Sequence, residues 1–511
     1  MLAKVFSASV MGIDAYPVEI EVDVARGLPT VIVVGLPDAA VRESRERVKS
    51  AIQNCGFKHP VRRVTISLAP ADTKKEGPGF DLPIALGILA ASEQLKPENL
   101  NDYYICGELA LDGAVRPIKG VLPMAIYARQ NGKKGFIVPC SNASEASVVS
   151  DLPVYPVTCL SQAIDFINGD SAIVPHRINP EEMFKESHEH QVDFSDVRGQ
   201  ENTKRAIEIA AAGGHNVIMI GPPGSGKTML ARRIPTILPP MTLDESLETT
   251  KIHSIMGLIS SGQSLITTRP FRSPHHTISN SGLIGGGTFP RPGDVSLAHN
   301  GVLFLDELAE FNRQVLEVLR QPLEDGEVTI SRAAGSVKYP ARFMLIAAMN
   351  PSPSGYEYDP RQPNSCSPAQ VQKYMSKISG PLLDRIDIHL EVAQVHYKDL
   401  SSKQNGEPSA AIRERVIKAR KIQNERFRRS KFFCNAHMTT SAVKKYCELS
   451  HDSQSILNNA MEQLGLSARA YHRILKLART IADLASSADI QTPHILEAIQ
   501  YRSLDRTRFF A

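Results

Sequence analysis

The stretch Gly221-Pro-Pro-Gly-Ser-Gly-Lys-Thr228 decides how this chain folds, and it follows the apolar run 217–220. Its spacing fits the pattern G-x-x-x-x-G-K-[ST], in which glycines let backbone N–H groups approach phosphates closely. A helix that begins at Lys227 would direct the positive end of its dipole at the same phosphates. The alternative is a glycine-rich turn without a ligand. The apolar run before the loop and the helix-forming residues after it favour a phosphate-binding loop.

This loop predicts a site for ATP and Mg²⁺. Lys227 is expected to reach the β- and γ-phosphates, and the hydroxyl of Thr228 is expected to hold Mg²⁺. The residues expected to contact the nucleotide are Gly221, Pro222, Pro223, Gly224, Ser225, Gly226, Lys227, Thr228 and Met229.

A second apolar run, 301–305, ends in two carboxylates, Asp306 and Glu307. In a nucleotide site Asp306 would support Mg²⁺, while Glu307 would orient or deprotonate the attacking water. Asp-Glu after an apolar run is common by itself, but it becomes specific when it follows a phosphate loop. A further apolar run, 343–349, ends at Asn350 and predicts the next strand. Residues 193–397 are therefore predicted to form an αβα nucleotide-binding core.

Composition and length describe an ordinary globular protein. The chain has 511 residues, enough for about three domains of roughly 100–200 residues each. Its net charge is only +4, so any affinity for nucleic acid must come from local patches. The seven cysteines are scattered without a C-x-x-C pair, and no apolar run approaches the length of a membrane span. We therefore expect a cytoplasmic protein without membrane association.

Residues 1–165 are predicted to form a separate α/β unit. Alternation at 18–24 and apolar runs at 30–34 and 63–68 predict strands, and 39–53 predicts an amphipathic helix. The polar segment 166–192 is predicted to be a linker. Its His188 and His190 lack a third ligand, which favours a solvated loop over a metal site.

Residues 398–511 are predicted to be helical. The segment 411–431 carries nine Lys or Arg and two Glu and predicts one long basic helix. Its charged face either meets solvent or faces DNA, and the sequence favours neither. A second helix should begin after a cap at Ser467, and a third at Thr492 with Pro493 in its first turn.

A pair of adjacent histidines, His275 and His276, stands in the stretch 270–279. Two histidines suggest a metal site, but neighbouring residues of a strand point to opposite faces and do not easily share one ion. Hydrogen-bonding or core roles are therefore favoured.

The first unit resembles the proteolytic domain of Lon proteases, a fold like that of ribosomal protein S5. The resemblance rests on Lys75-Glu-Gly-Pro-Gly-Phe-Asp and on the stretch 107–120. It places the Lon catalytic serine at Gly79 and the catalytic lysine at Leu122, with Lys119 nearby. Because glycine offers no nucleophile and leucine no base, the resemblance implies a scaffold or binding role without peptidase activity.

The core resembles the AAA+ ATPases. The segment 193–200 resembles their entry segment, and Asn350 resembles the sensor that touches the γ-phosphate or the water. Arg385, in Gly380-Pro-Leu-Leu-Asp-Arg, matches the arginine that reaches a neighbouring subunit's nucleotide. Its alternative is an ion pair with Asp384 or Asp387. In the α-helical lid, Arg469 resembles the second sensor, with Arg473 as the second choice.

Two insertions resemble those of magnesium-chelatase-like and MCM-like members of that superfamily. The stretch 327–339 alternates around a break at 333–336 and predicts the presensor hairpin. The glycine-rich stretch 282–293 reads as a strandless helix-2 insert. In ring helicases such elements line the pore, which makes DNA-binding candidates of Phe289, Arg291, Arg332 and Lys338. The alternative is that both insertions serve subunit packing.

Taken over nearly its whole length, the chain resembles the YifB/ComM family of bacterial AAA+ ATPases. The resemblance implies a homo-hexameric motor that drives branch migration of single- and double-stranded DNA junctions in natural transformation, alongside recombination proteins. A magnesium-chelatase motor subunit and a chaperone-like adaptor remain alternatives. Some relatives carry a cysteine cluster after the sensor asparagine, whereas this chain has Cys366 alone there, so no structural zinc is expected.

Overall fold

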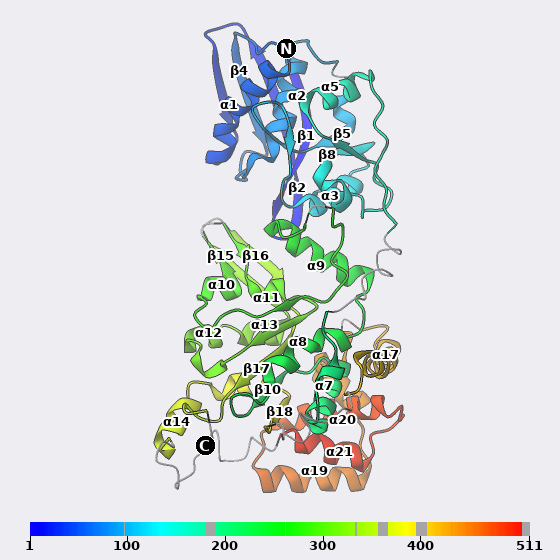
Figure 1. The fold of residues 1–511 in the computed structure, drawn as a ribbon. Helices are drawn as coiled ribbons and strands as arrows, with labels where there is room; N and C mark the ends of the chain where they lie inside the picture. The colour runs from blue at the N-terminus through cyan, green and yellow to red at the C-terminus, as the bar shows by residue number, and fades with distance from the viewer. Residues whose placement is uncertain are drawn as a thin grey trace. The chain divides into compact units, whose positions relative to one another are not determined.

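The computed structural model divides into two compact units. It describes residues 1–96, 98–179, 191–260, 262–287, 289–332, 335–355, 366–394, 406–430 and 432–502. The first unit comprises residues 1–187 together with 243–267, and the second comprises 188–242 and 268–511 (Figure 1). Among the described helices, none combines the length and the hydropathy needed to cross a bilayer.

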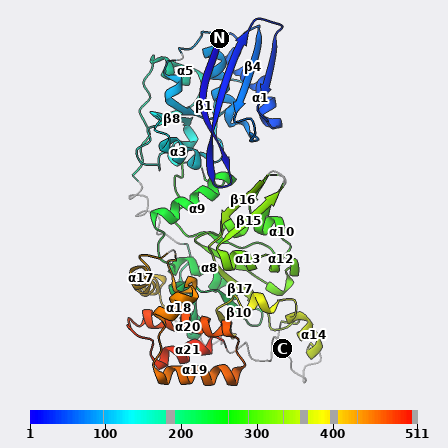
Figure 2. The ribbon, with the colours of Figure 1, turned by 180° about the vertical axis from the view of Figure 1, so that it is seen from behind.

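The first unit is a seven-stranded mixed sheet with the order β3-β4-β2-β1-β5-β8-β9. The long antiparallel pair of β1 and β2 forms its middle, as Figure 2 shows, and β5, β8 and β9 extend it in parallel. Its strands are β1 (Leu2–Met11), β2 (Asp14–Ala25), β3 (Thr30–Val34), β4 (Arg63–Ala69), β5 (Tyr103–Ile105), β8 (Gly135–Pro139) and β9 (Val154–Val157), with a small separate ribbon of β6 (Glu108–Leu109) and β7 (Val115–Arg116).

Helices complete two hydrophobic cores on this sheet. One core collects side chains of α1, α2 and α5 with those of β1, β2 and β4, and the other collects α3 with β5 and β8. The helix expected at 39–53 is confirmed as α1, which its N-cap Asp38 begins. The helices are α1 (Ala39–Asn54), α2 (Asp81–Ala91), α3 (Val121–Gln130), α4 (Ala143–Ala146) and α5 (Leu160–Asn168).

Two of the predicted domain boundaries differ from the observed division into two units. The first unit was expected to end at residue 165, and the core 193–397 was expected to be uninterrupted. Helix α5 runs on to Asn168, and His176 still pairs with Val154 in the first unit. In addition, the segment 243–267, which lies within the stretch assigned to the ATPase core, packs in the first unit. Residues 180–190, with the two linker histidines, lie outside the described residues.

The segment 243–267 is held in the first unit by helix α9 (Leu243–Met256). Ser254 donates a short hydrogen bond to the buried Glu145, which also accepts from the backbone N–H of Leu122 at 3.0 Å. Leu265 joins the hydrophobic core around α3. Leu122, where the Lon resemblance places a catalytic lysine, is thus a buried residue beside a segment of the ATPase part of the chain.

The second unit is built on a five-stranded parallel sheet with the order β11-β14-β17-β10-β18. Its strands are β10 (Val217–Ile220), β11 (Phe271–Arg272), β14 (Val302–Leu305), β17 (Met344–Met349) and β18 (Ile388–Glu391). The central strands are buried on both faces, as their uninterrupted apolar runs predict. Helices α7 (Glu201–Gly213) and α8 (Lys227–Ile237) pack on this core.

Both insertions of the second unit contain strands. The expected hairpin is confirmed as β15 (Glu327–Arg332) paired with β16 (Gly335–Pro340). The expectation that 282–293 is strandless is wrong, because β12 (Gly285–Gly286) pairs with β13 (Arg291–Pro292) after the short helix α10 (Asn280–Ile284). Glycine allows this close pairing, since a Cβ on Gly285 would lie 2.2 Å from the carbonyl oxygen of Arg291. The short helix α11 (Asp294–Leu297) follows.

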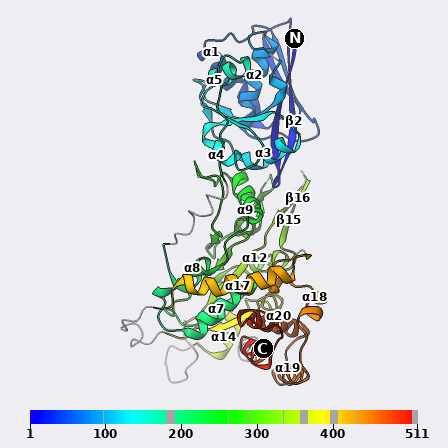
Figure 3. The ribbon, with the colours of Figure 1, turned by 90° about the vertical axis from the view of Figure 1, so that its right-hand side faces the viewer.

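The C-terminal part is helical as expected, and its helices pack on α7 and α8. The basic helix is shorter than predicted: α17 ends at Arg426 instead of continuing to 431. Figure 3 shows α17 lying along α7 and α8. Ser467 caps α20 and Pro493 lies in the first turn of α21, as predicted. These helices are α17 (Ser409–Arg426), α18 (Thr440–Tyr446), α19 (His451–Leu464), α20 (Ala468–Leu484) and α21 (Thr492–Gln500).

Candidate nucleotide site

The candidate site lies at the carboxyl edge of the parallel sheet, where three neighbouring strands end in polar residues. Strand β10 leads into the phosphate loop, β14 ends at Asp306 and Glu307, and β17 ends at Asn350. Because β17 pairs with both β10 and β14, these three ends are adjacent. Ligands of open parallel sheets bind at this edge, so the topology gathers the residues that the sequence separates.

The phosphate loop begins at a position that only glycine fits. A Cβ on Gly221 would lie 2.2 Å from the carbonyl oxygen of Val392. Gly226, at φ +87°, caps α8, so Lys227 and Thr228 open the helix with their backbone N–H groups at its positive end. Gln200 supports the loop from the entry segment, donating to the carbonyl oxygen of Ser225 at 2.8 Å.

Lys227 is 8 % exposed and lies between the loop and the end of β17. Its Nζ donates to the carbonyl oxygens of Gly221 at 2.6 Å and Pro222 at 2.9 Å, and lies 3.3 Å from Oδ1 of Asn350. Burial lowers the pKa of Lys227, an effect that Asp306 opposes. The structure therefore brings Lys227 and Asn350, which stand far apart in the sequence, to the same point.

The two residues proposed for Mg²⁺ are in direct contact. The hydroxyl of Thr228 donates to Oδ2 of Asp306 at 2.7 Å, and the backbone N–H of Glu307 donates to Oδ1 of Asp306 at 3.0 Å. A hydroxyl and a carboxylate beside a phosphate loop are the oxygen ligands that Mg²⁺ takes in nucleotide sites. The residues present thus fit a magnesium–nucleotide complex.

Glu307 follows in a left-handed backbone conformation, at φ +51°. Its side chain is 58 % exposed, and its Oε2 lies 3.3 Å from Nδ1 of His276. His275 and His276 follow β11 instead of lying within it, and their rings are 4.1 Å apart. The expectation that the pair points to opposite faces of a strand is therefore wrong, but the expected hydrogen-bonding role is confirmed. His275 meets the hydroxyl of Thr277 at 2.9 Å.

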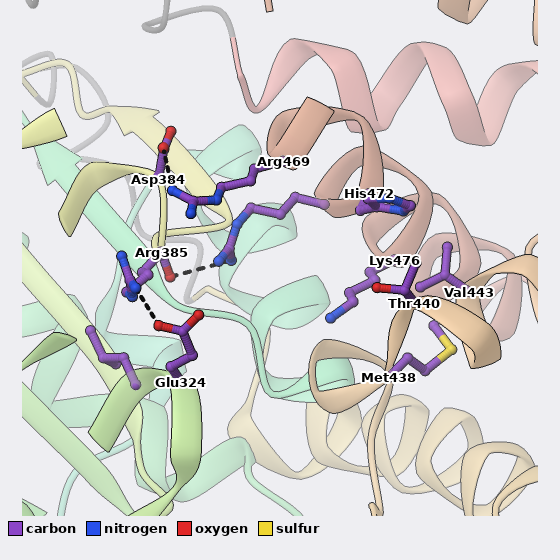
Figure 4. Close-up of a pocket in the computed structure, with 11 residues that line it drawn as sticks. Glu324, Asp384, Arg385, Met438, Thr440, Val443, Arg469, His472 and Lys476 are labelled. Atoms are coloured by element: carbon purple, nitrogen blue, oxygen red, sulfur yellow. Dashed lines mark hydrogen bonds and ion pairs between the residues drawn. The ribbon is translucent and has the colours of Figure 1, made fainter. Parts of the chain in front are cut away.

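Arg385 and Arg469 meet in one pocket of about 270 Å³ (Figure 4). Arg385 forms its ion pair with Glu324, in neither of the two pairings expected from the sequence, and Arg469 lies 3.4 Å from Asp384. The Arg385 guanidinium lowers the pKa of Glu324. None of the phosphate-loop residues lines this pocket. The acidic and basic residues that line the pocket are Glu324, Asp384, Arg385, Arg469, His472, Arg473 and Lys476.

The four candidate DNA residues lie on two insertions that touch each other. Tyr339 of β16 donates to the carbonyl oxygen of Pro290 at 2.7 Å, and the Arg332 guanidinium lies beside Gly286. Arg291 and Arg332 are exposed, whereas Phe289 is half-buried. Lys338, also exposed, forms an ion pair with Glu327 across the hairpin at 2.5 Å.

Much of the basic charge of α17 has partners within the second unit. Arg415 pairs with Glu208 and Glu407, and Arg426 pairs with Asp483. The two alternatives, a face in solvent and a face toward DNA, therefore concern only the other exposed basic residues of the segment 411–431. Among the described residues these are Lys418 and Lys421 in α17, and Arg428 and Arg429 beyond its end. Of these, Lys418 pairs with Glu414 at 2.9 Å.

Sequence reasoning did not connect His276 with Glu307, Glu324 with Arg385, or Gln200 with the loop. Each partner comes from a different element, and no spacing along the chain marks such a contact. The expectation about zinc concerns a region of which 356–365 lie outside the described residues. Among the rest, no group of three or more His, Cys, Asp or Glu side chains is placed to hold a metal ion.

Comparison with known proteins assigns the chain to a family. The model for magnesium chelatase subunit ChlI matches residues 193–400, a second ChlI model matches 20–142, and the ChlI C-terminal model matches 406–502. The chain is 46 % identical over 507 residues to the competence protein ComM of Haemophilus influenzae, covering 99 % of this chain and 98 % of that one. The chain belongs to the YifB/ComM family of magnesium-chelatase-like proteins.

Other members are similar over the same length. The uncharacterised YifB protein of Salmonella typhimurium is 45 % identical over 506 residues, covering 99 % of this chain and 98 % of the relative. By contrast, the magnesium-chelatase 38 kDa subunit of Rhodobacter capsulatus is 26 % identical over 177 residues, which is 31 % of this chain and 50 % of that subunit. The family models indicate an AAA+-type motor core with ATPase activity.

Proposed function

We propose that this protein is an ATP-dependent DNA motor that drives branch migration of DNA junctions, as a ring of six copies, during natural transformation. The observation that carries the ATPase part is the contact between Thr228 and Asp306 beside the buried Lys227. The DNA part is supported by the basic residues on the two touching insertions and by the similarity to a competence protein.

In the proposed reaction each protein group has one task. Thr228 and Asp306 would hold Mg²⁺, which when bound would supply positive charge beside the phosphates, and Lys227 and Asn350 would orient the terminal phosphate. Glu307 accepts a proton from the attacking water or orients it. The Lon-like first unit is proposed to act as a scaffold without peptidase activity, since Gly79 and Leu122 stand at the positions of the Lon dyad.

Arg385 and Arg469 are proposed to complete the site of a neighbouring copy. Both arginines line a pocket that contains none of the phosphate-loop residues. A nucleotide bound in the loop of the same copy would therefore not lie in this pocket. A guanidinium supplied by a neighbour stabilises charge that develops on the transferred phosphoryl group.

The test measures ATP turnover with and without four-way junction DNA, together with strand exchange on labelled junctions. We expect junction DNA to raise turnover several-fold, and we expect Lys227→Ala and Glu307→Gln each to reduce turnover by at least about a hundredfold. Gly79→Ala, in the first unit, is the control. The added Cβ would lie 3.5 Å from Ile118, an ordinary contact, so this change should affect neither ATP turnover nor strand exchange.

A chelatase-type motor is the second candidate, because three chelatase models match the chain. Turnover that ignores DNA but responds to a porphyrin would favour that reading. Turnover that responds only to a protein partner would favour an adaptor instead. Either result would overturn the DNA proposal while leaving the ATPase assignment in place.

A further inference from the structure

The seven-stranded sheet of the first unit ends in a strand whose outer edge is open. β3 is the first strand in the sheet order, and among the described strands it pairs with β4 alone. Figures 1 and 2 show β4 at one side of the first unit, with α1 beside it. An edge strand presents backbone N–H and C=O groups that can accept one further strand.

One face of β3 exposes aliphatic side chains. Val31 and Val33 pack against the core of the first unit, so Ile32 and Val34 point to the opposite face, where they are 38 % and 43 % exposed. Neighbouring aliphatic residues that are also exposed lie just before β3, just after it and just before β4. They are Leu28, Leu36 and Val61. Exposed apolar side chains that gather in this way mark interaction surfaces.

Arginines surround the same edge. Arg63 is the first residue of β4, and a Cβ on Gly27 would lie 3.5 Å from its Cβ, so the turn before β3 lies against it. From α1, Arg45 reaches the edge itself, where its Nη1 donates to the carbonyl oxygen of Val31 at 3.4 Å. None of the exposed arginines here forms an ion pair with a described residue. We call them the edge cluster: Arg26, Arg45, Arg62 and Arg63.

These features together decide which partner fits. A second copy that paired through the same edge would bring Arg45 toward its own counterpart, and like charges oppose such pairing. The exposed apolar residues are all aliphatic, whereas surfaces that bind single-stranded nucleic acid stack bases on aromatic side chains. Carboxylates, by contrast, form bidentate pairs with guanidinium groups. Exposed Glu43 and Glu46 of α1 only partly offset the edge cluster.

We propose that the open edge of β3 binds an extended acidic segment of a partner protein, which adds a strand to the sheet. Its aliphatic side chains cover Ile32 and Val34, and its carboxylates pair with the edge cluster. A carboxylate that binds Arg45 releases the carbonyl of Val31 for the new strand, because a contact of 3.4 Å is long for such a hydrogen bond. Backbone hydrogen bonds then supply affinity, and alternate side chains supply specificity.

Two double variants test the two parts of this surface. Ile32→Thr with Val34→Thr removes the aliphatic face and keeps β-branched side chains, which favour strands. Arg62→Glu with Arg63→Glu reverses charge and leaves β3 unaltered. The matched controls change an exposed leucine and an exposed arginine elsewhere in the first unit. They are Leu111→Thr and Arg129→Glu.

The experiment titrates the full chain into a fluorescein-labelled peptide of about ten residues that alternates Val with Asp or Glu. We expect saturable binding, measured by anisotropy, that each double variant weakens by at least about tenfold at an unchanged melting temperature. Both controls should bind as the wild type does. A peptide with Lys in place of the acidic residues should bind at least about tenfold more weakly, and so should one with Pro in place of Val, because Pro lacks the backbone donor. Hydrogen exchange at residues 30–34 should slow when the acidic peptide is added.

Four outcomes would overturn the inference. The acidic peptide does not bind, or it binds both double variants as tightly as the wild type. Labelled single-stranded or duplex DNA binds more tightly than the peptide and loses affinity in Arg62→Glu with Arg63→Glu, which would make the edge a nucleic-acid surface. The assembly measured by ultracentrifugation shrinks in Ile32→Thr with Val34→Thr, which would make the edge an interface between copies.

Failure of the proposed function is a separate result. Both double variants keep the whole nucleotide site, so their ATP turnover, with and without junction DNA, should equal that of the wild type. A wild-type protein that ignores DNA would refute the DNA motor while leaving the peptide titration to decide the docking edge.

Discussion

At the scale of single residues, the candidate site depends on a few positions where one side chain fits and others do not. Gly221 is one, since the carbonyl oxygen of Val392 occupies the place that a Cβ would take. Thr228 and Asp306 are others, because their contact needs a hydroxyl and a carboxylate at hydrogen-bond distance. Replacing these residues should therefore affect nucleotide binding more than the overall stability of the fold.

For Gly221→Ala we expect the affinity for ATP to fall by at least about tenfold, which corresponds to ~1.4 kcal/mol. The added Cβ would lie 2.2 Å from a backbone oxygen and 3.2 Å from Oγ of Ser225, so the loop has to shift. Titration with a fluorescent ATP analogue measures the effect, with Gly79→Ala as the control. An unchanged dissociation constant in Gly221→Ala would show that the loop tolerates the Cβ.

At the scale of elements, a buried polar network fixes the C-terminal helix α20 to the sheet. Asp387 is 2 % exposed and directly precedes β18. It pairs with Arg473 of α20 and lies 3.3 Å from Nδ1 of His215, which in turn meets the Thr480 hydroxyl at 2.8 Å. Burial alone would raise the pKa of Asp387, but Arg473 and His215 hold it well below the ordinary aspartate value. Arg385 lies two residues before Asp387, so the network also fixes the stretch of backbone from which the Arg385 side chain extends.

We expect Asp387→Asn to lower the free energy of unfolding by about 3–5 kcal/mol, because it removes the buried carboxylate that pairs with the partly buried Arg473. Asp384→Asn, three residues earlier in the chain, is the matched control: its partner Arg469 is 65 % exposed, and a surface pair is worth at most about 1 kcal/mol. Urea unfolding of the two variants measures the difference. Equal losses would show that the buried pair has no special weight.

The lowered pKa of Asp387 also predicts that its contribution to the free energy of unfolding depends on pH. A carboxyl whose pKa is lower in the folded state stabilises the fold above its unfolded-state pKa, 3.8 here, and this contribution is lost as the pH falls below that value. The stability difference between wild type and Asp387→Asn should therefore be full at pH 7 and shrink under acid conditions. A difference that stays constant down to acid unfolding would contradict the assignment.

The segment 243–267 shows a second effect at this scale. The chain leaves the second unit after α8, contributes α9 and Leu265 to the first unit, and returns before β11. Buried Glu145 receives hydrogen bonds from that segment and from Leu122 and Asn142, and burial raises its pKa against these partners. The units are thus joined at several points of the chain, including both ends of a segment that begins just after the phosphate-loop helix.

At the scale of the whole molecule, the proposal requires neighbouring copies. A chain altered by Lys227→Ala keeps Arg385, and one altered by Arg385→Ala keeps its phosphate loop, so each lacks a different half of the site. We expect each variant alone to be inactive and an equal mixture to regain turnover at about a quarter of its interfaces, where one intact half meets the other. Native mass spectrometry confirms that the copies have mixed.

Two results of that experiment would contradict action between copies. Mixed assemblies without any recovered turnover would place Arg385 and Lys227 in one site of one copy. Full turnover in Arg385→Ala alone would remove Arg385 from the mechanism. A mixture with Arg469→Ala in place of Arg385→Ala tests in the same way whether the second guanidinium of the pocket also acts on a neighbour.

The sequence by itself determined the local elements and the polar residues that follow them. Apolar runs that end in a phosphate loop, in Asp306-Glu307 and in Asn350 predict buried strands with polar ends, because strand burial and polar termination are local properties. The cap at Ser467 and the hairpin around 327–339 were predictable for the same reason, although the break expected at 333–336 is narrower, since Gly335 and Ser336 already pair with Arg332 and Ser331.

Only the tertiary structure decided which of these pieces meet. Glu307 pairs with His276, and Arg385 pairs with Glu324, although no spacing along the chain relates these residues. Nor does chain spacing show that the phosphate loop is absent from the pocket of Arg385 and Arg469, or that 243–267 packs in the first unit. Side-chain partners across elements are selected by strand order and by the competition of buried polar groups for hydrogen bonds, and neither is encoded in a local pattern.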